Sequence, residues 1–238
     1  AAPLLVKYEV PATIFIVSNI VDKGLWLWDE ALYYLTSHAP VGAYSIQHNH
    51  RTLEFTLHTT DDRIQAWTGL VNTVLYESNS RRWKLIRECQ DMLGIGLPST
   101  PPAANRSMNW DELVSLNPLI DIGSHTRNHP ILSTVQDPDE LASEILGSKK
   151  DIEKHIGKPV TTFCYPNGLA PDYNEFSLRE IKHSGYECAV LAHGGLVTPS
   201  NSNMYELPRI SAQKTLVTYK SEASGLRHLK EKYSKYWS

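Results

Sequence analysis

Apolar residues along this chain fall into short runs that predict buried strands separated by helices. The runs Ala12–Ser18 and Leu119–Gly123 are rich in β-branched and other apolar residues, which is typical of strands buried on both faces. Similar runs occur at Thr161–Tyr165, Glu187–Leu191 and Leu207–Ile210. Helical patterns lie between them, at Trp110–Leu116, Asp137–Gly157 and Tyr173–His183. Because strands that alternate with helices form parallel βαβ units, the pattern predicts a parallel α/β sheet.

The stretch from about Asn19 to Pro102 has a different pattern. Two runs that alternate apolar and polar residues predict a surface hairpin of Ala43–Gln47 and Thr52–Thr59. Helices are expected at Asp29–Leu35, Asp61–Tyr76 and Ser80–Leu93, with Asp61 and Ser80 as N-caps. We interpret residues 1–238 as one domain, in which about 19–102 is an insertion on one αβ connection.

Composition excludes several classes of protein. The chain has 238 residues, of which 41% are hydrophobic and 21% charged, as in an ordinary globular chain. A net charge of −3 leaves no basic stripe for nucleic acid. No apolar run reaches the roughly 18 residues of a membrane span, and no signal peptide is visible. The chain lacks an initial Met, and Ala1 falls inside an expected helix, so the start looks truncated and localisation stays open.

The three cysteines are an odd number and stand far apart in the sequence, at Cys89, Cys164 and Cys188. A disulfide framework needs paired cysteines, and a cysteine zinc site needs them closely spaced. The sequence therefore predicts neither.

Two histidines follow directly after the predicted strand Leu119–Gly123. They are His125 and His129, with Pro130 behind the second. Imidazole is the commonest nitrogen ligand of zinc, so two rings held by one turn can point at one ion. With ten histidines in the chain, a bare His-x-x-x-His pair is more often a surface or packing feature. The position of this pair favours a metal site, because reactive groups of parallel α/β folds collect at the carboxyl ends of strands.

A second strand end carries the turn Pro166-Asn167-Gly168. Such a turn leaves backbone N–H groups unpaired, and free amides beside a metal can hold the oxyanion of an acyl-transfer reaction. The alternative is a simple β-turn with Tyr165 in the core.

At this point the residues match a family. The stretch from Trp110 to Ile210 resembles the polysaccharide deacetylases, the NodB-homology proteins of carbohydrate esterase family four. Asp121 to Pro130 is similar to the family's His-Ser/Thr-x-x-His-Pro motif, Phe163 to Gly168 to its Phe-x-Tyr-Pro-x-Gly motif, and Glu206 to Ile210 to its Leu-Pro-Arg-Ile element. Pro3 to Val17 resembles the segment after the first family motif.

The resemblance implies a distorted (β/α) barrel and a hydrolase that removes N- or O-acetyl groups from a carbohydrate. It implies a divalent ion, with zinc expected, held by an aspartate and by His125 and His129. The backbone amide of Asn167 would hold the oxyanion, and Tyr165 and Pro166 would shape the sugar subsite. Arg209 would orient a catalytic carboxylate, or equally form a structural ion pair.

The family's first motif, Thr-Phe-Asp-Asp, supplies the base and the third metal ligand and would lie before Ala1. If the chain is complete, the barrel lacks its first strand and leaves an unpaired edge that another segment or a partner chain must cover. Thr59–Asp62 mimics the motif, although Asp61 fits a helix cap better, and Asp121 is another candidate carboxylate. Neither His193 nor His228 has the sequence context of the family's general acid.

Three hypotheses remain open. The first is a metal-dependent carbohydrate deacetylase. The second is an impaired relative that binds glycan without turnover because the Asp motif is absent. The third, the least favoured, is an unrelated metal hydrolase using Asp61 or Asp62. The sequence specifies neither the sugar nor the oligomeric state.

Overall fold

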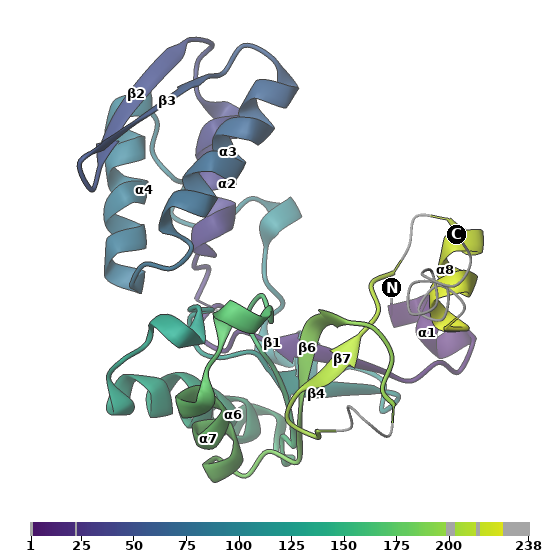
Figure 1. Cartoon of the computed structure of the whole chain (residues 1–238). Coiled ribbons are helices and arrows are strands. Elements are labelled where there is room, and N and C mark those ends of the chain that lie inside the picture. Colours follow the sequence, from purple (N-terminus) through teal and green to yellow (C-terminus); the bar gives the residue numbers. More distant parts are fainter. Residues whose placement is uncertain (1, 22, 199–202, 213–214, 226–238) are drawn as a thin grey trace, which may run out of the picture.

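A computed structural model describes residues 2–21, 23–198, 203–212 and 215–225 of the chain. Figure 1 shows two parts, a parallel sheet with its helices and a lobe of helices and a hairpin above it. The sheet part contains α1 Ala2–Lys7, β1 Ala12–Ile16, α5 Trp110–Val114, β4 Ile120–Ser124, α6 Pro138–Ile156, β5 Thr162–Cys164, α7 Glu175–His183, β6 Cys188–Gly194, β7 Leu207–Arg209 and α8 Leu216–Ala223. The lobe contains α2 Trp28–His38, β2 Ala43–His48, β3 Arg51–Thr56, α3 Thr60–Val74 and α4 Asn79–Leu93.

The central sheet is parallel throughout, in the order β1-β4-β5-β6-β7, which confirms the predicted α/β class. Within the described residues, β1 and β7 are the end strands, so the sheet is open there and closure of a barrel stays a prediction. The pairing of β1 with β4 runs to Ile16 opposite Ser124. The N–H of His125 then donates to the carbonyl of Ile16 at 2.9 Å, so the loop after β4 starts from a fixed point.

Helix α6 forms where its capping residues predict it. The Asp137 carboxylate accepts hydrogen bonds from the N–H groups of Asp139 and Glu140, and Gly157 ends the helix with a φ of 67°. Its apolar face is fully buried against the sheet through Leu141, Ile145 and Ile152. Figure 1 shows α6 and α7 together on one side of the strands.

The lobe has its own hydrophobic core, separate from that of the sheet. The predicted hairpin is confirmed, with β2 and β3 paired antiparallel and Tyr44 opposite Phe55. The lobe touches the sheet part through the Tyr76 hydroxyl, which donates to the Asp172 carboxylate at 3.1 Å. The interpretation of this lobe as an insertion in one domain stays a prediction.

The predicted caps of the two long lobe helices are wrong by two residues. Helix α3 is capped by Thr59, not Asp61, because the Thr59 hydroxyl accepts from the Asp62 N–H at 3.1 Å and the Asp62 carboxylate accepts from the Thr59 N–H at 3.0 Å. Helix α4 begins after Ser78 rather than Ser80.

None of the helices in the described ranges is long and apolar enough to cross a membrane. The three cysteines are free, and two of them, Cys89 and Cys164, are buried.

Gly123 on β4 lies against side chains of both neighbouring strands, Phe15 on β1 and Thr162 on β5. A Cβ atom there would be 2.6 Å from the Phe15 ring and 2.6 Å from the Thr162 hydroxyl. We therefore expect Gly123→Ala to lower the free energy of unfolding by about 1–3 kcal/mol through overpacking. Gly69→Ala is the control, because a Cβ there meets nothing within 4 Å in a helix, and it should stabilise by about 0.5–1 kcal/mol. Urea unfolding measures both, and equal effects of the two substitutions would contradict the expectation.

Candidate functional site

The two histidines after β4 converge. The ring centroids of His125 and His129 are 4.8 Å apart, with the planes at 71° to each other. Both side chains are half-buried. The loop that carries them therefore brings two imidazoles together at the carboxyl end of a central strand, as the sequence predicts.

The hydrogen bonds of the rings decide which nitrogens are available. The Nδ1 of His125 lies 2.7 Å from the carbonyl oxygen of Cys164, which only accepts, so Nδ1 carries the proton and Nε2 keeps its lone pair. The Nδ1 of His129 is buried and has no hydrogen-bond partner among the described residues. A fixed tautomer on one ring and an unpaired nitrogen on the other are what a metal ligand pair requires.

Both rings are held in the neutral form. Burial, followed by the neighbouring His129 and Arg209, lowers the pKa of His125 to about 3. The hydrogen bond to the Cys164 carbonyl acts in the opposite direction and raises this pKa. Burial, and then the charge of Arg82, lower the pKa of His129 to about 4. At neutral pH neither imidazole carries a proton that would compete with a cation.

The loop between the histidines has a strained backbone. Thr126 and His129 have φ values of 66° and 56°, a left-handed conformation that costs energy for residues with a Cβ. The Thr126 hydroxyl compensates by accepting from the His129 N–H at 3.0 Å. Strain of this kind persists only where surrounding structure enforces it, so the loop needs support.

That support comes from α6, and sequence reasoning missed it. The buried Glu144 carboxylate accepts from the backbone N–H of Arg127 at 3.0 Å, and from the backbone and side chain of Asn128 at 2.9 and 2.6 Å. The Arg127 guanidinium pairs with Asp151 at 2.8 Å, and Ser148 donates to the Thr126 carbonyl at 3.0 Å. A signal was present in the sequence, since Glu144, Ser148 and Asp151 interrupt the apolar pattern of the helix on the side that faces the loop.

The Pro166-Asn167-Gly168 turn lies beside the histidine loop through the Cys164 carbonyl that His125 binds. The Gly168 N–H donates to the Pro166 carbonyl at 2.6 Å, which closes a tight turn around Asn167 at φ 57°. Asn167 is exposed, and no described residue accepts a hydrogen bond from its N–H. Gly168 is required, because a Cβ there would meet the Ala192 nitrogen at 2.6 Å.

The other two residues of this segment are less accessible. Tyr165 is 1% exposed, and its hydroxyl donates to the Tyr205 carbonyl at 2.8 Å. Its ring packs against Phe163 and Tyr173, as in the alternative that places Tyr165 in the core. Pro166 is also buried. Both side chains are buried, and their expected contact with a sugar stays a prediction.

Arg209 binds the sheet. Its Nε donates to the Leu191 carbonyl, and its Nη2 lies 3.2 Å from the Cys164 sulfur. Within the described residues no carboxylate is in ion-pair distance of it, so neither expected pairing is seen there. The positive charge of Arg209 still affects the site, because it contributes to the lowered pKa of His125.

No group of three or more His, Cys, Asp or Glu that could hold a metal occurs in the part of the chain that the structure describes. Asp121 is exposed near the opposite end of β4, and the Asp62 carboxylate serves the cap of α3. His193 is exposed on β6, and His228 lies outside the described residues. Within the described residues, the site therefore brings together two candidate ligands, His125 and His129.

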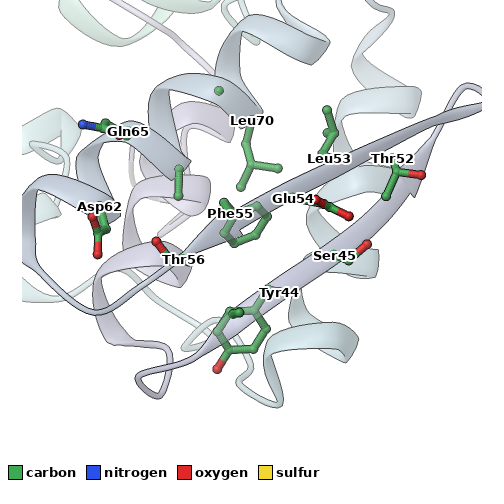
Figure 2. Close-up of a pocket in the computed structure, with 13 residues that line it drawn as sticks. Tyr44, Ser45, Thr52, Leu53, Glu54, Phe55, Thr56, Asp62, Gln65 and Leu70 are labelled. Carbon is green, nitrogen blue, oxygen red and sulfur yellow. The ribbon is translucent and has the colours of Figure 1, made fainter.

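A large open groove lies elsewhere, in the lobe. It has a volume of about 910 Å³ and runs between the hairpin and α3, with Tyr44, Phe55 and Leu70 on its walls and Glu54 and Asp62 among its polar residues (Figure 2). No residue of the histidine loop lines it.

Comparison with known proteins agrees with the motifs. Residues 104–189, which include both histidines and the Asn167 turn, match the polysaccharide deacetylase family. This match confirms the resemblance over that stretch. A comparison with curated proteins finds no match.

Solved structures resemble the chain at low identity. One is a de-N-acetylase from Aggregatibacter actinomycetemcomitans, with a TM-score of 0.49 and 16% identity over 92% of this chain and 67% of that one. Another is the Streptococcus pyogenes deacetylase PplD in complex with acetate, with a TM-score of 0.43 and 20% identity over 53% and 52%. A polysaccharide deacetylase from Bacillus cereus has a TM-score of 0.42 and 18% identity over 61% and 47%. The chain thus spans 47% to 67% of the length of these structures.

Glu144 provides a test of how the loop is supported. Glu144→Ala leaves two part-buried backbone N–H groups without their acceptor, and should cost about 1–2 kcal/mol of unfolding free energy. Lys150→Ala on the exposed side of the same helix is the control and should change stability by less than about 0.5 kcal/mol. Hydrogen exchange of the Arg127 and Asn128 amides should rise in the Glu144 variant alone. Unchanged exchange would contradict this role.

The histidine pair predicts a pH dependence. Because both pKa values lie below the ordinary 6.5, the neutral rings stabilise the fold above that pH, and the contribution is lost as the pH falls towards 4. In that window, each histidine lowers the free energy of unfolding by at most about 1.4 kcal/mol for each unit by which the pH falls. Urea unfolding with a chelator, at about pH 7 and about pH 4.5, should show a smaller loss for a His125→Gln, His129→Gln double variant than for wild type. Equal losses would contradict the assignment.

Proposed function

Since residues 104–189 match the polysaccharide deacetylases, we propose that this protein is a metal-dependent hydrolase that removes acetyl groups from a carbohydrate. The observation that carries the proposal is the pair of converging, neutral imidazoles at the end of β4, one of which has its Nε2 freed by the bond from Nδ1 to the Cys164 carbonyl.

The two imidazoles provide some, but not all, of the ligands that a divalent ion needs. His125 and His129 would hold it, and zinc is the expected ion because it accepts imidazole nitrogen. The bound ion would polarise the acetyl carbonyl and lower the pKa of water. Two imidazoles are one ligand short of a catalytic zinc site, so a further carboxylate is required, which the family places in the Thr-Phe-Asp-Asp motif.

The chain's own groups then have distinct tasks. The free N–H of Asn167, on the exposed turn, is available to donate to the oxygen on which negative charge develops. Burial, the neighbouring His129 and the Arg209 charge keep His125 neutral, with its one proton on Nδ1. By the family motif, Tyr165 and Pro166 would shape the sugar subsite, and both are buried in the described structure.

The shortage of ligands favours one second candidate, a protein that binds acetylated glycan without turnover. The specific observation is that no third His, Cys, Asp or Glu joins the pair among the described residues. Metal content and acetate release separate the two candidates.

Substitution of the ligands tests the proposal. His125→Ala and His129→Ala should each lower zinc affinity, and acetate release from N-acetylated oligosaccharides, by roughly a hundredfold or more. Zinc is measured by elemental analysis after equilibrium dialysis. His183→Ala, an exposed histidine at the end of α7, is the matched control and should leave both unchanged.

The outcomes separate the hypotheses. Wild-type zinc binding without acetate release would favour the glycan-binding candidate. Full acetate release by both ligand variants would contradict the proposed function.

A further inference from the structure

A second, smaller pocket lies between the lobe and the histidine loop. It has a volume of about 370 Å³, within the roughly 300–1,000 Å³ of small-molecule sites. Three tryptophans and three asparagines contribute to its lining, which consists of Asn19, Ile20, Gly24, Leu25, Trp26, Trp28, Asn79, Trp83, Ser99 and Asn128. Its walls thus come from both parts of the fold.

The pocket shares one residue, Asn128, with the histidine loop. Asn128 precedes His129 in the loop, and its amide is oriented by Glu144 and by the Asn19 side chain at 2.9 Å. On the other wall, Asn79 and Trp83 project from α4 of the lobe. A ligand in this pocket would therefore contact the loop that carries the histidine pair.

The walls are largely preformed. Trp26 donates from Nε1 to the Pro98 carbonyl at 3.0 Å, and the Trp28 ring lies 4.7 Å from the Arg82 guanidinium carbon. Both rings are nearly buried, whereas Trp83 is half-buried and Leu25 is 48% exposed at the rim. Rings that are already ordered lose little conformational entropy when a ligand binds.

Polar capacity remains for a ligand. The structure shows no hydrogen bond from the Asn79 side chain to another described residue, and the Trp28 Nε1–H has no partner there. Among the residues that the structure describes, no charged side chain lines the pocket. This combination suits a neutral ligand with an apolar face and several hydroxyl or amide groups, because an ion would find no counter-charge and a purely apolar ligand would leave the amides unpaired.

We propose that this pocket binds one pyranose unit of an acetylated glycan, with the sugar face on Trp83 and its polar groups on Asn79 and Asn128. The inference rests on the proposed function, and it makes the lobe the part of the chain that selects the sugar next to the one that loses its acetyl group. The pocket would then set affinity for the glycan, separately from the chemistry at the histidines.

Direct binding tests this without requiring turnover. N-Acetylglucosamine oligomers of one to four units are titrated calorimetrically into chelator-treated protein. We expect Trp83→Ala and Asn79→Ala each to weaken binding at least tenfold, and Trp83→Phe to retain most of it because a ring face remains. Tyr44→Ala, in the hairpin groove, is the matched aromatic control and should bind as wild type. Thermal unfolding verifies that each variant is folded, and Asn79→Ala, which removes only an amide, carries the test if Trp83→Ala does not fold.

The outcomes distinguish the two proposals. Three results would overturn the pocket assignment and leave the histidine site untouched. They are wild-type affinity in folded Trp83→Ala or Asn79→Ala protein, loss of binding in Tyr44→Ala alone, and no binding by the wild type. Binding that depends on Trp83, in a protein that releases no acetate, would support the pocket and contradict the proposed deacetylation. Where acetate is released, Trp83→Ala should raise KM with little change in kcat, because it removes binding remote from the reacting group.

Discussion

The hydrogen bond between His125 Nδ1 and the Cys164 carbonyl is the contact on which the site depends. It joins the ends of two neighbouring parallel strands, fixes the tautomer of one imidazole, and brings the Asn167 turn beside the histidine loop. Parallel pairing makes this possible, because it brings the carboxyl ends of β4 and β5 to the same edge of the sheet. Without the strand pairing, the two motifs would be unrelated pieces of chain.

The second requirement is a buried carboxylate outside the motifs. Burial raises the pKa of Glu144, although the hydrogen bonds from Asn128 and Arg127 lower it. Keeping this carboxylate ionised in a buried position therefore costs free energy. What offsets that cost is the pairing of backbone N–H groups in a loop with two left-handed residues. Arg127 adds to the same support, since its guanidinium lies over Gly147, where a Cβ would be 2.6 Å away. The helix thus contributes to the histidine geometry without touching either ring.

The lobe and the sheet part are built on separate cores, yet they meet where the chemistry is expected. Arg82, which is buried in the lobe and whose pKa falls only to about 10, stays charged at neutral pH and influences His129 across the boundary. The tryptophan-lined pocket occupies the same boundary. A segment with no recognised motif therefore shapes the electrostatics and the surroundings of the candidate site.

The sequence by itself determined the parallel α/β class, the hairpin and the two strand ends that carry the candidate residues, because hydrophobic periodicity is a local property of the chain. The displaced caps of α3 and α4 show where local signals are degenerate, since Thr59, Asp61 and Asp62 all accept hydrogen bonds well and only the observed geometry selects one. Tertiary structure alone decided that Tyr165 is core, that Arg209 binds the sheet, and that Glu144 supports the loop. These are contacts between segments far apart in sequence, and no local pattern encodes which distant partner a buried polar group will meet.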